Sequence, residues 1–280
     1  MIGRNRLLKI TGLSIAGLFL LFGLTYLFFP IDRINTLITQ YLEVQELVLS
    51  PAAHKTVLPG LAWDNLVLSS PQGALVSCDK LTVRPLLGPL LVGRIKLSAS
   101  GIIRDGHFDL KYGLNGKEAF SLESDGINLA DIPFFKTILA AKVGGNLWIK
   151  GAAIRTPKGL NGELRFELKQ LEFSGVKLGG FSLPDAANLR SQGMVRITGG
   201  KPRVESFTLQ GEGLYMRVSG EIPSGNNAVN APINLILEIM PKPDFMERQK
   251  LVFMLLTKFM ISPGNFRIPI HGTLLKPAIL

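Results

Sequence analysis

Residues 162–173 read Gly-Glu-Leu-Arg-Phe-Glu-Leu-Lys-Gln-Leu-Glu-Phe, and this stretch decides the fold class. Leu164, Phe166 and Leu168 fall at every second position, and charged residues stand between them. Because successive side chains of a β-strand point to opposite faces, this alternation is typical of a strand with one buried and one solvated face. The stretch therefore predicts an antiparallel sheet.

The same alternation recurs from about residue 45 to the end of the chain. It predicts further strands at residues 95–103, 108–112, 147–149, 194–198, 204–209, 214–222, 233–239 and 266–270. Glycine often stands at the ends of these segments, where it permits bends and tight turns. We expect a mainly β fold in which consecutive strands pair in one curved antiparallel sheet. Helices do not alternate with the strands, which disfavours a doubly wound α/β fold.

Few segments have helical periodicity. Apolar residues at three- and four-residue spacing predict a helix over residues 31–42, which either caps the sheet or lies on a bilayer surface. Short helices are expected at 85–91 and 131–141, and the longest at 244–260. We expect the longest helix either to pack against the sheet or to close an apolar groove or touch the membrane.

Residues 10–29 form a run of 20 residues without a charge. As a helix this run would span about 30 Å, the thickness of the hydrocarbon core of a bilayer. The run ends in Phe28, Phe29 and Pro30, which do not resemble a signal-peptide cleavage site. We therefore expect an uncleaved, single-pass transmembrane anchor.

The topology follows from the cations that precede this run. Arg4, Arg6 and Lys9 stand before it, and no acidic residue occurs before Asp32. By the positive-inside rule, residues 1–9 stay in the cytoplasm, residues 10–29 cross the membrane and residues 30–280 are exported.

The composition disfavours several function classes. The only cysteine is Cys78, and the three histidines lie far apart at His54, His107 and His271, so no multi-cysteine or histidine-cluster metal site is expected. No phosphate-binding glycine motif or nucleophile motif is present outside the apolar run. The net charge of +10 comes without basic runs interleaved with aromatic residues, and the β domain is exported, so nucleic acid is not an expected partner. The sequence predicts a protein that is not an enzyme and needs no cofactor.

Four segments together carry a family resemblance: "LFFPIDRINTLI" at 27–38, "LPGLAWDNLVLSSPQG" at 58–73, "LTVRPLLGPLLVGRIKLSASGIIRDGHFDL" at 81–110, and "FRIPIHGTLLKPAIL" at 266–280. Their order resembles the type II secretion system protein N family (GspN) over nearly the whole chain. The anchor, the short amphipathic helix and the strand followed by Pro-Leu-Leu are also similar to AsmA- and TamB-like proteins. These motifs are apolar and glycine patterns and include no chemical signature.

The resemblance implies a bacterial inner-membrane subunit with a periplasmic β domain that takes part in protein export by contacting other secretion-system subunits. The AsmA-like similarity implies a half-pipe or taco-shaped sheet with an apolar inner face. It also implies an alternative function, the binding or transfer of lipid acyl chains along a groove. The residues expected to line that groove are Leu164, Phe166, Leu168, Ile233, Leu235, Leu237 and Ile239. An unfilled lining would favour lipid binding, and a lining filled by the protein's own side chains would favour a scaffold.

The topology can be tested with reporter fusions placed after residue 45. We expect alkaline phosphatase to be active there and a cytoplasmic fluorescent reporter to be dark, because residues 30–280 are exported. Fluorescence without phosphatase activity, or release of soluble protein after cleavage near Pro30, would contradict the predicted anchor.

Overall fold

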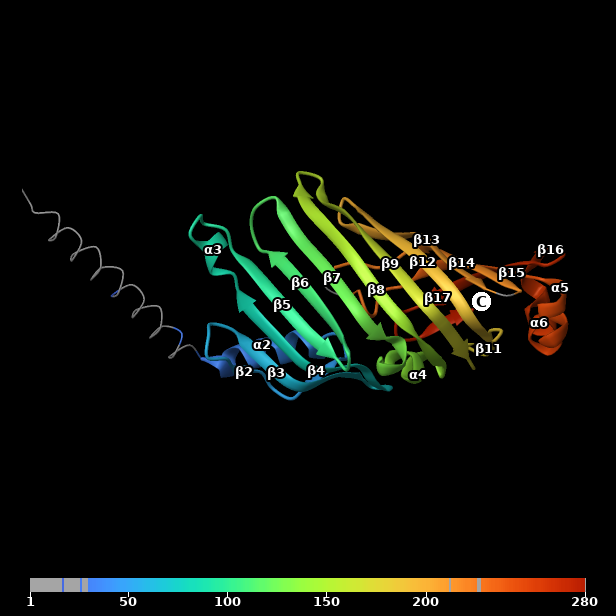
Figure 1. The fold of residues 1–280 in the computed structure, drawn as a ribbon, viewed down its shortest axis with the longest axis horizontal. Coiled ribbons are helices and arrows are strands. Elements are labelled where there is room, and N and C mark those ends of the chain that lie inside the picture. The colour runs from blue at the N-terminus through green and yellow to red at the C-terminus, as the bar shows by residue number, and fades with distance from the viewer. Residues whose placement is uncertain (1–16, 18–25, 27–29, 212, 226–227, 280) are drawn as a thin grey trace, which may run out of the picture.

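The computed structural model describes Gly17, Tyr26 and residues 30–211, 213–225 and 228–279. The chain is mainly β, with a 16-stranded antiparallel sheet and a separate two-stranded sheet formed by β10 and β11 (Figure 1). Strands that follow one another in sequence are mostly neighbours in the large sheet, which runs from β1 at one edge to β16 at the other. The predicted consecutive antiparallel pairing is confirmed.

The strands of the first half are β1 (Val48–Ser50), β2 (His54–Lys55), β3 (Leu61–Ser70), β4 (Gly73–Pro85), β5 (Lys96–Ile103), β6 (Gly106–Gly113), β7 (Glu118–Asn128) and β8 (Lys142–Thr156). Those of the second half are β9 (Gly159–Ser174), β10 (Lys177–Leu178), β11 (Phe181–Ser182), β12 (Ala186–Thr198), β13 (Lys201–Gly211), β14 (Leu214–Glu221), β15 (Asn234–Pro241), β16 (Met260–Ser262), β17 (Asn265–Gly272) and β18 (Pro277–Ile279). The helices are α2 (Ile31–Glu43), α3 (Leu87–Leu90), α4 (Phe134–Leu139), α5 (Pro243–Arg248) and α6 (Lys250–Leu256), with 3-10 turns at η1 (Leu129–Asp131) and η2 (Thr257–Phe259).

Three long strands, β3, β4 and β7, do not alternate strictly, because irregularities such as the register shift between Leu68 and Ser69 in the β3–β4 pair interrupt their period of two. In β3, Asn65 has a φ of 53° in the left-handed region without a register shift, and Trp63 and Leu66 on its two sides are both buried although they lie three positions apart. In β7 the register shifts between Ser124 and Ile127, both of which are buried. An extra residue in a strand moves the following side chains to the other face, which hides the strand from a search for strict alternation.

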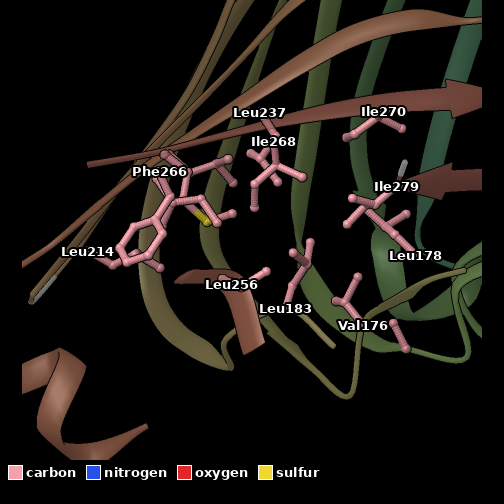
Figure 2. Packing of buried hydrophobic residues seen from close by; sticks show 14 of the residues in the cluster. Val176, Leu178, Leu183, Leu214, Leu237, Leu256, Phe266, Ile268, Ile270 and Ile279 are labelled. Carbon is pink, nitrogen blue, oxygen red and sulfur yellow. The ribbon is translucent and has the colours of Figure 1, made fainter. Parts of the chain in front are cut away.

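The sheet folds over so that its C-terminal strands share a core with β9, while the buried residues of β3 to β7 form a separate cluster. Ile268, Ile270 and Ile279 of the C-terminal strands belong to the same buried cluster as Leu168 and Leu171 of β9. Figure 2 shows the first three side chains opposite Val176, Leu178 and Leu183, which come from the segment between β9 and β12. The C-terminal strands therefore cover part of the inner face of the strands that precede them.

The two ends of the sheet also meet. Leu275, in the turn between β17 and β18, is buried against Leu47 and Leu75 near the beginning of the sheet. Asn230 adds a hydrogen bond from its side-chain amide to the Gln45 carbonyl oxygen at 3.4 Å. This contact joins segments that lie about two hundred residues apart, and it closes one end of the folded sheet.

Helix α2 caps the N-terminal part of the sheet, which confirms the first of the two placements expected for it. Ile38 and Leu42 pack against buried clusters that include β-strand residues. The Asn35 side chain also exchanges hydrogen bonds with the backbone of Ala53, accepting from its N–H at 3.1 Å and donating to its carbonyl at 3.2 Å. Leu37 and Tyr41 of the same helix stay exposed.

The sequence predicts one continuous helix over residues 244–260, and this prediction is wrong. The chain forms α5, α6 and η2 in succession, and Gln249 breaks the helix with a φ of −121° and a ψ of 35°. The Gln249 side chain bonds the Asp185 backbone twice, accepting from its N–H at 2.8 Å and donating to its carbonyl at 2.7 Å. Phe245 before the break and Phe253 after it both belong to the buried cluster, and their ring centroids lie 6.2 Å apart.

None of the described helices is both long and apolar enough to cross a membrane. The predicted anchor, residues 10–29, lies outside the described residues except for Gly17 and Tyr26. Its role as a membrane span therefore stays a prediction.

Gly162 tests how closely β8 and β9 approach one another. A Cβ at this position would lie 2.5 Å from the Ala153 Cα, and an added methyl would therefore push the two backbones apart. We expect Gly162→Ala to destabilise the chain by about 1–3 kcal/mol, the usual cost of overpacking.

The matched control is Gly180→Ala, since a Cβ there would meet no atom within 4 Å. Urea unfolding of the full chain in detergent, followed by circular dichroism, measures both variants. Equal midpoints for Gly162→Ala and the parent would contradict the close approach of β8 and β9.

Candidate functional site

The pairing register aligns inner-face residues in rows that cross the sheet. One of these, the Phe166 row, runs from β3 to β17. Its members are Trp63, Leu81, Gly101, Phe108, Ser124, Ile149, Phe166, Gly193, Phe207, Val218, Leu237 and Ile268. All are apolar or small except Ser124. A single row therefore links the first half of the sheet to its C-terminal strands.

Two parallel rows flank the Phe166 row. The Leu164 row consists of Leu61, Val83, Ala99, Leu110, Leu122, Gly151, Leu164, Val195, Val204, Gly220, Leu235 and Ile270. The Leu168 row consists of Ile127, Leu147, Leu168, Ser191, Leu209, Met216, Ile239 and Phe266. Together the three rows form the apolar inner face of the sheet.

The structure places the seven predicted lining residues on this one face. Leu164 and Leu235 share a row, as do Phe166 and Leu237, and Leu168 and Ile239. Ile233 lies just before β15, and its N–H donates to the Gly272 carbonyl at 2.8 Å. Spacing along the sequence could indicate each strand's apolar side, but only the register shows that these sides coincide.

The seven residues differ in burial. Leu168, Ile233, Leu237 and Ile239 are buried in the large cluster, and Ile239 has no exposed surface at all. Leu164, Phe166 and Leu235 are only half-buried. Part of the predicted lining is thus a filled core.

The half-buried part of the inner face lies on the middle strands. It includes Leu110, Leu122, Ile149, Leu164 and Phe166, none of which belongs to a buried cluster. These side chains come from β6, β7, β8 and β9. They form a band of apolar surface that the C-terminal strands leave partly accessible; we call it the open band.

Aromatic rings partly cover the glycines next to this band. The Phe166 ring lies 5.1 Å from the Phe207 ring, measured between centroids. A Cβ on Gly193, between them in the row, would collide with the Phe166 ring. The glycine therefore leaves the space in which the ring lies flat over the sheet.

Two buried serines on the inner face were not indicated by the sequence. Ser124 and Ser191 expose 2% and 1% of their surface, and the structure gives neither hydroxyl a hydrogen-bond partner. A strand alternation rule counts serine as polar and expects it outside. Here the small side chains fit opposite Ile149 and Leu168, where a larger residue would not.

The outer face carries charge instead. Lys150 pairs with Glu123 at 3.2 Å and Arg165 with Glu163 at 2.7 Å. Around the half-buried Trp148 this face has two open hollows of about 420 and 460 Å³, lined largely by charged and polar side chains. Neither hollow has the apolar lining expected of a lipid site.

A second apolar surface lies on α6, at the opposite end of the molecule from α2 and β2 (Figure 1). Leu251, Met254 and Leu255 of α6 and Ile261 of β16 each expose 60% or more of their surface. We call these four residues the α6 patch. Phe253 and Leu256 on the other side of α6 are buried, so the helix is apolar on two sides and presents one of them to solvent.

Reactive side chains do not converge in the described part of the chain, where no group of three or more His, Cys, Asp or Glu is placed to hold a metal ion. Burial raises the pKa of the Cys78 thiol, whose Sγ donates to the carbonyls of Lys80 and Ile102 at 3.1 Å. A neutral buried thiol is a poor nucleophile. His54 faces Asp64 at 3.6 Å on the exposed surface.

Arg4, Arg6 and Lys9, which are predicted to set the membrane topology, lie outside the described residues. Comparison with protein-family models, curated proteins and solved structures finds no match for this chain.

The single variants Phe166→Asp and Leu237→Asp compare the stability cost of a charge in the open band with its cost in the filled core, at two positions of the same row. Leu237 is 3% exposed, so a carboxylate there would be buried without a partner. We expect Leu237→Asp to leave the chain unfolded or to cost several kcal/mol. Phe166→Asp should cost at most half as much, because water reaches the half-buried position.

Phe166→Leu is the control for the loss of the ring without the charge. Urea midpoints from the fluorescence of the buried Trp63 measure all three variants. If Phe166→Asp unfolds the chain as completely as Leu237→Asp does, the open band is part of a closed core.

Proposed function

We propose that the chain is an inner-membrane-anchored accessory subunit of the type II secretion system that acts through the surfaces of its β domain. In this proposal, residues 1–9 are cytoplasmic, residues 10–29 span the membrane, and residues 30–280 form a periplasmic half-pipe. The motif order that resembles the protein N family supports the assignment to this machine. The mainly β architecture with one large antiparallel sheet is consistent with it.

The observation that carries an interaction role is the α6 patch. Leu251, Met254 and Leu255 recur at three- and four-residue spacing on α6, at the end farthest from α2 (Figure 1), and each of them and Ile261 of the nearby β16 is at least 60% exposed. Contiguous exposed apolar surface on a protein marks a site that another molecule covers. Lys250 and Lys258 flank the patch in sequence and supply a polar rim.

The filled core supports the same proposal. Where the C-terminal strands cover the inner face, the protein's own side chains occupy the space: Phe266, Ile268 and Ile239 are each exposed by 1% or less. A half-pipe that is filled over this part has a fixed shape. It can hold the α6 patch at a set distance from the anchor.

Export in a bacterium that uses the type II route tests the proposal. We expect loss of the gene to trap folded enzymes in the periplasm and the parent chain to restore their export. The double variant Leu251→Glu and Leu255→Glu should fail to restore it, although both positions are exposed and the fold should persist. Enzyme activity in the culture medium and in the periplasm measures the effect.

The control for added surface charge is Ile154→Glu, at a 41% exposed position on β8 away from α6. This variant should restore export like the parent. Full export without the gene would overturn the role in secretion, and full export with the double variant would remove the α6 patch from the proposal.

The open band favours a second candidate function, the binding of lipid acyl chains. Leu122, Ile149 and Leu164 are half-buried apolar residues. Among the described residues they belong to no buried cluster, so part of their surface stays accessible. An acyl chain gains about 0.8 kcal/mol for each buried CH₂ group. Solvent extraction of the purified parent and of Phe166→Asp tests this candidate: acyl lipid present in the parent and depleted in the variant supports it, and its absence from both excludes it.

A further inference from the structure

The connections β2–β3 and β4–β5 form an exposed apolar tip. Val57 and Leu58 of the first connection expose 101% and 61% of their surface, and Leu87, Leu91 and Val92 of the second expose 60%, 89% and 70%. We call these five residues the anchor-side tip. These residues belong neither to the α6 patch nor to the open band.

The register brings the two connections together. Leu61 at the beginning of β3 pairs with Val83 near the end of β4, so both connections leave adjacent strands at the same end. Gly60 lies so close to β4 that a Cβ there would meet the Arg84 side chain at 2.6 Å and the Val83 carbonyl oxygen at 2.7 Å. The two connections therefore begin side by side at one end of the sheet, and all five exposed apolar residues belong to them.

Hydrogen bonds hold the larger connection in shape. The Leu86 N–H donates to the Lys96 carbonyl at 2.8 Å, and the Arg94 N–H donates to that of Pro89 at 2.9 Å. From the neighbouring turn, Asn115 accepts from the Ile95 N–H at 2.7 Å and donates to the Gly93 carbonyl at 2.9 Å. An ordered connection thus keeps its leucines and valine in solvent, which is unfavourable unless another apolar phase receives them.

The end of the charge-free run is attached to this tip. The Tyr26 hydroxyl lies 2.8 Å from the Thr56 carbonyl oxygen and 2.9 Å from that of Gly60, the two residues that bracket Val57 and Leu58. The Lys55 ammonium group donates to the Tyr26 carbonyl at 3.3 Å and lies 5.8 Å from the centre of its ring. Tyr26 stands four residues before Pro30, where the run predicted to cross the membrane has ended.

The charges around the tip suit an anionic surface. Arg84 and Arg94 are exposed, and Lys117 is exposed in the adjacent turn. Glu118, which follows Lys117, is paired with Lys96. Basic side chains that surround exposed apolar ones are typical of segments that enter the headgroup region of a bilayer.

We propose that the anchor-side tip inserts into the outer leaflet of the same membrane that holds residues 10–29. The occupant of this surface is phospholipid: acyl chains receive Val57, Leu58, Leu87, Leu91 and Val92, and anionic headgroups meet Arg84 and Arg94. The domain then contacts the bilayer at two points, which fixes its orientation. In that orientation, the α6 patch points away from the membrane, because α3 and α6 lie at opposite ends of the long axis (Figure 1).

Site-directed spin labelling of the full chain tests this insertion. Leu91→Cys is labelled with a nitroxide and reconstituted into vesicles of phosphatidylethanolamine and phosphatidylglycerol, and Leu255→Cys on α6 is the matched control. The parent serves as the blank, because its only thiol, Cys78, is 3% exposed. Collision rates with oxygen, which concentrates in the bilayer, and with a water-soluble nickel chelate report the depth of each label.

We expect the label at position 91 to collide preferentially with oxygen and the label at position 255 with the nickel chelate. Equal, high accessibility of both labels to the nickel chelate overturns the proposal. Spin–spin broadening at position 91 also overturns it, because a second copy of the chain then covers the tip. The reporter fusions after residue 45 test the anchor separately, so a failed insertion is distinguished from a wrong topology.

Discussion

The structure depends on covering one apolar face that extends across nearly the whole sheet. Because side chains alternate along every strand and the strands pair in register, the apolar residues of β3 to β17 coincide on a single side. No set of long helices is available among the described residues to cover that side. The sheet therefore has to fold over and pack its C-terminal strands on its own inner face.

This solution covers the face unevenly. The Leu168 row is packed beneath the C-terminal strands, the β9–β12 segment and the broken helix, whereas the middle of the Leu164 and Phe166 rows stays half-buried. The contact of Leu275 with Leu47 and Leu75 closes one end. A fold of this kind is rigid where it is filled and has an accessible apolar band where it is not, so scaffold and lipid-binding functions both fit parts of the same sheet.

Two exposed apolar surfaces lie at opposite ends of the molecule (Figure 1). The anchor-side tip lies beside Tyr26, and the α6 patch lies at the far end of the long axis. Both present large aliphatic side chains that the protein does not bury itself. A chain attached to a membrane at the first surface and to a partner at the second would place the sheet between them, with its charged outer face in water.

The sequence by itself determined the fold class, the consecutive antiparallel pairing and the apolar side of most strands, because these follow from a local period of two. It also placed α2 correctly, because the apolar stripe of a helix likewise depends only on the spacing of residues near one another in the sequence. Strands β3, β4 and β7 escaped because the left-handed Asn65 and the register shifts at Leu68/Ser69 and Ser124/Ile127 interrupt the period. The helix break escaped because Gln249 bonds the backbone of Asp185, which lies 64 residues away in the sequence. Only the tertiary structure decided which of the seven predicted lining residues are core: Leu237 is buried and Phe166 half-buried in the same row, because the sheet folds over one of them and leaves the other partly uncovered. How far a sheet folds over depends on contacts between its two ends, and a period within one strand carries no information about those contacts.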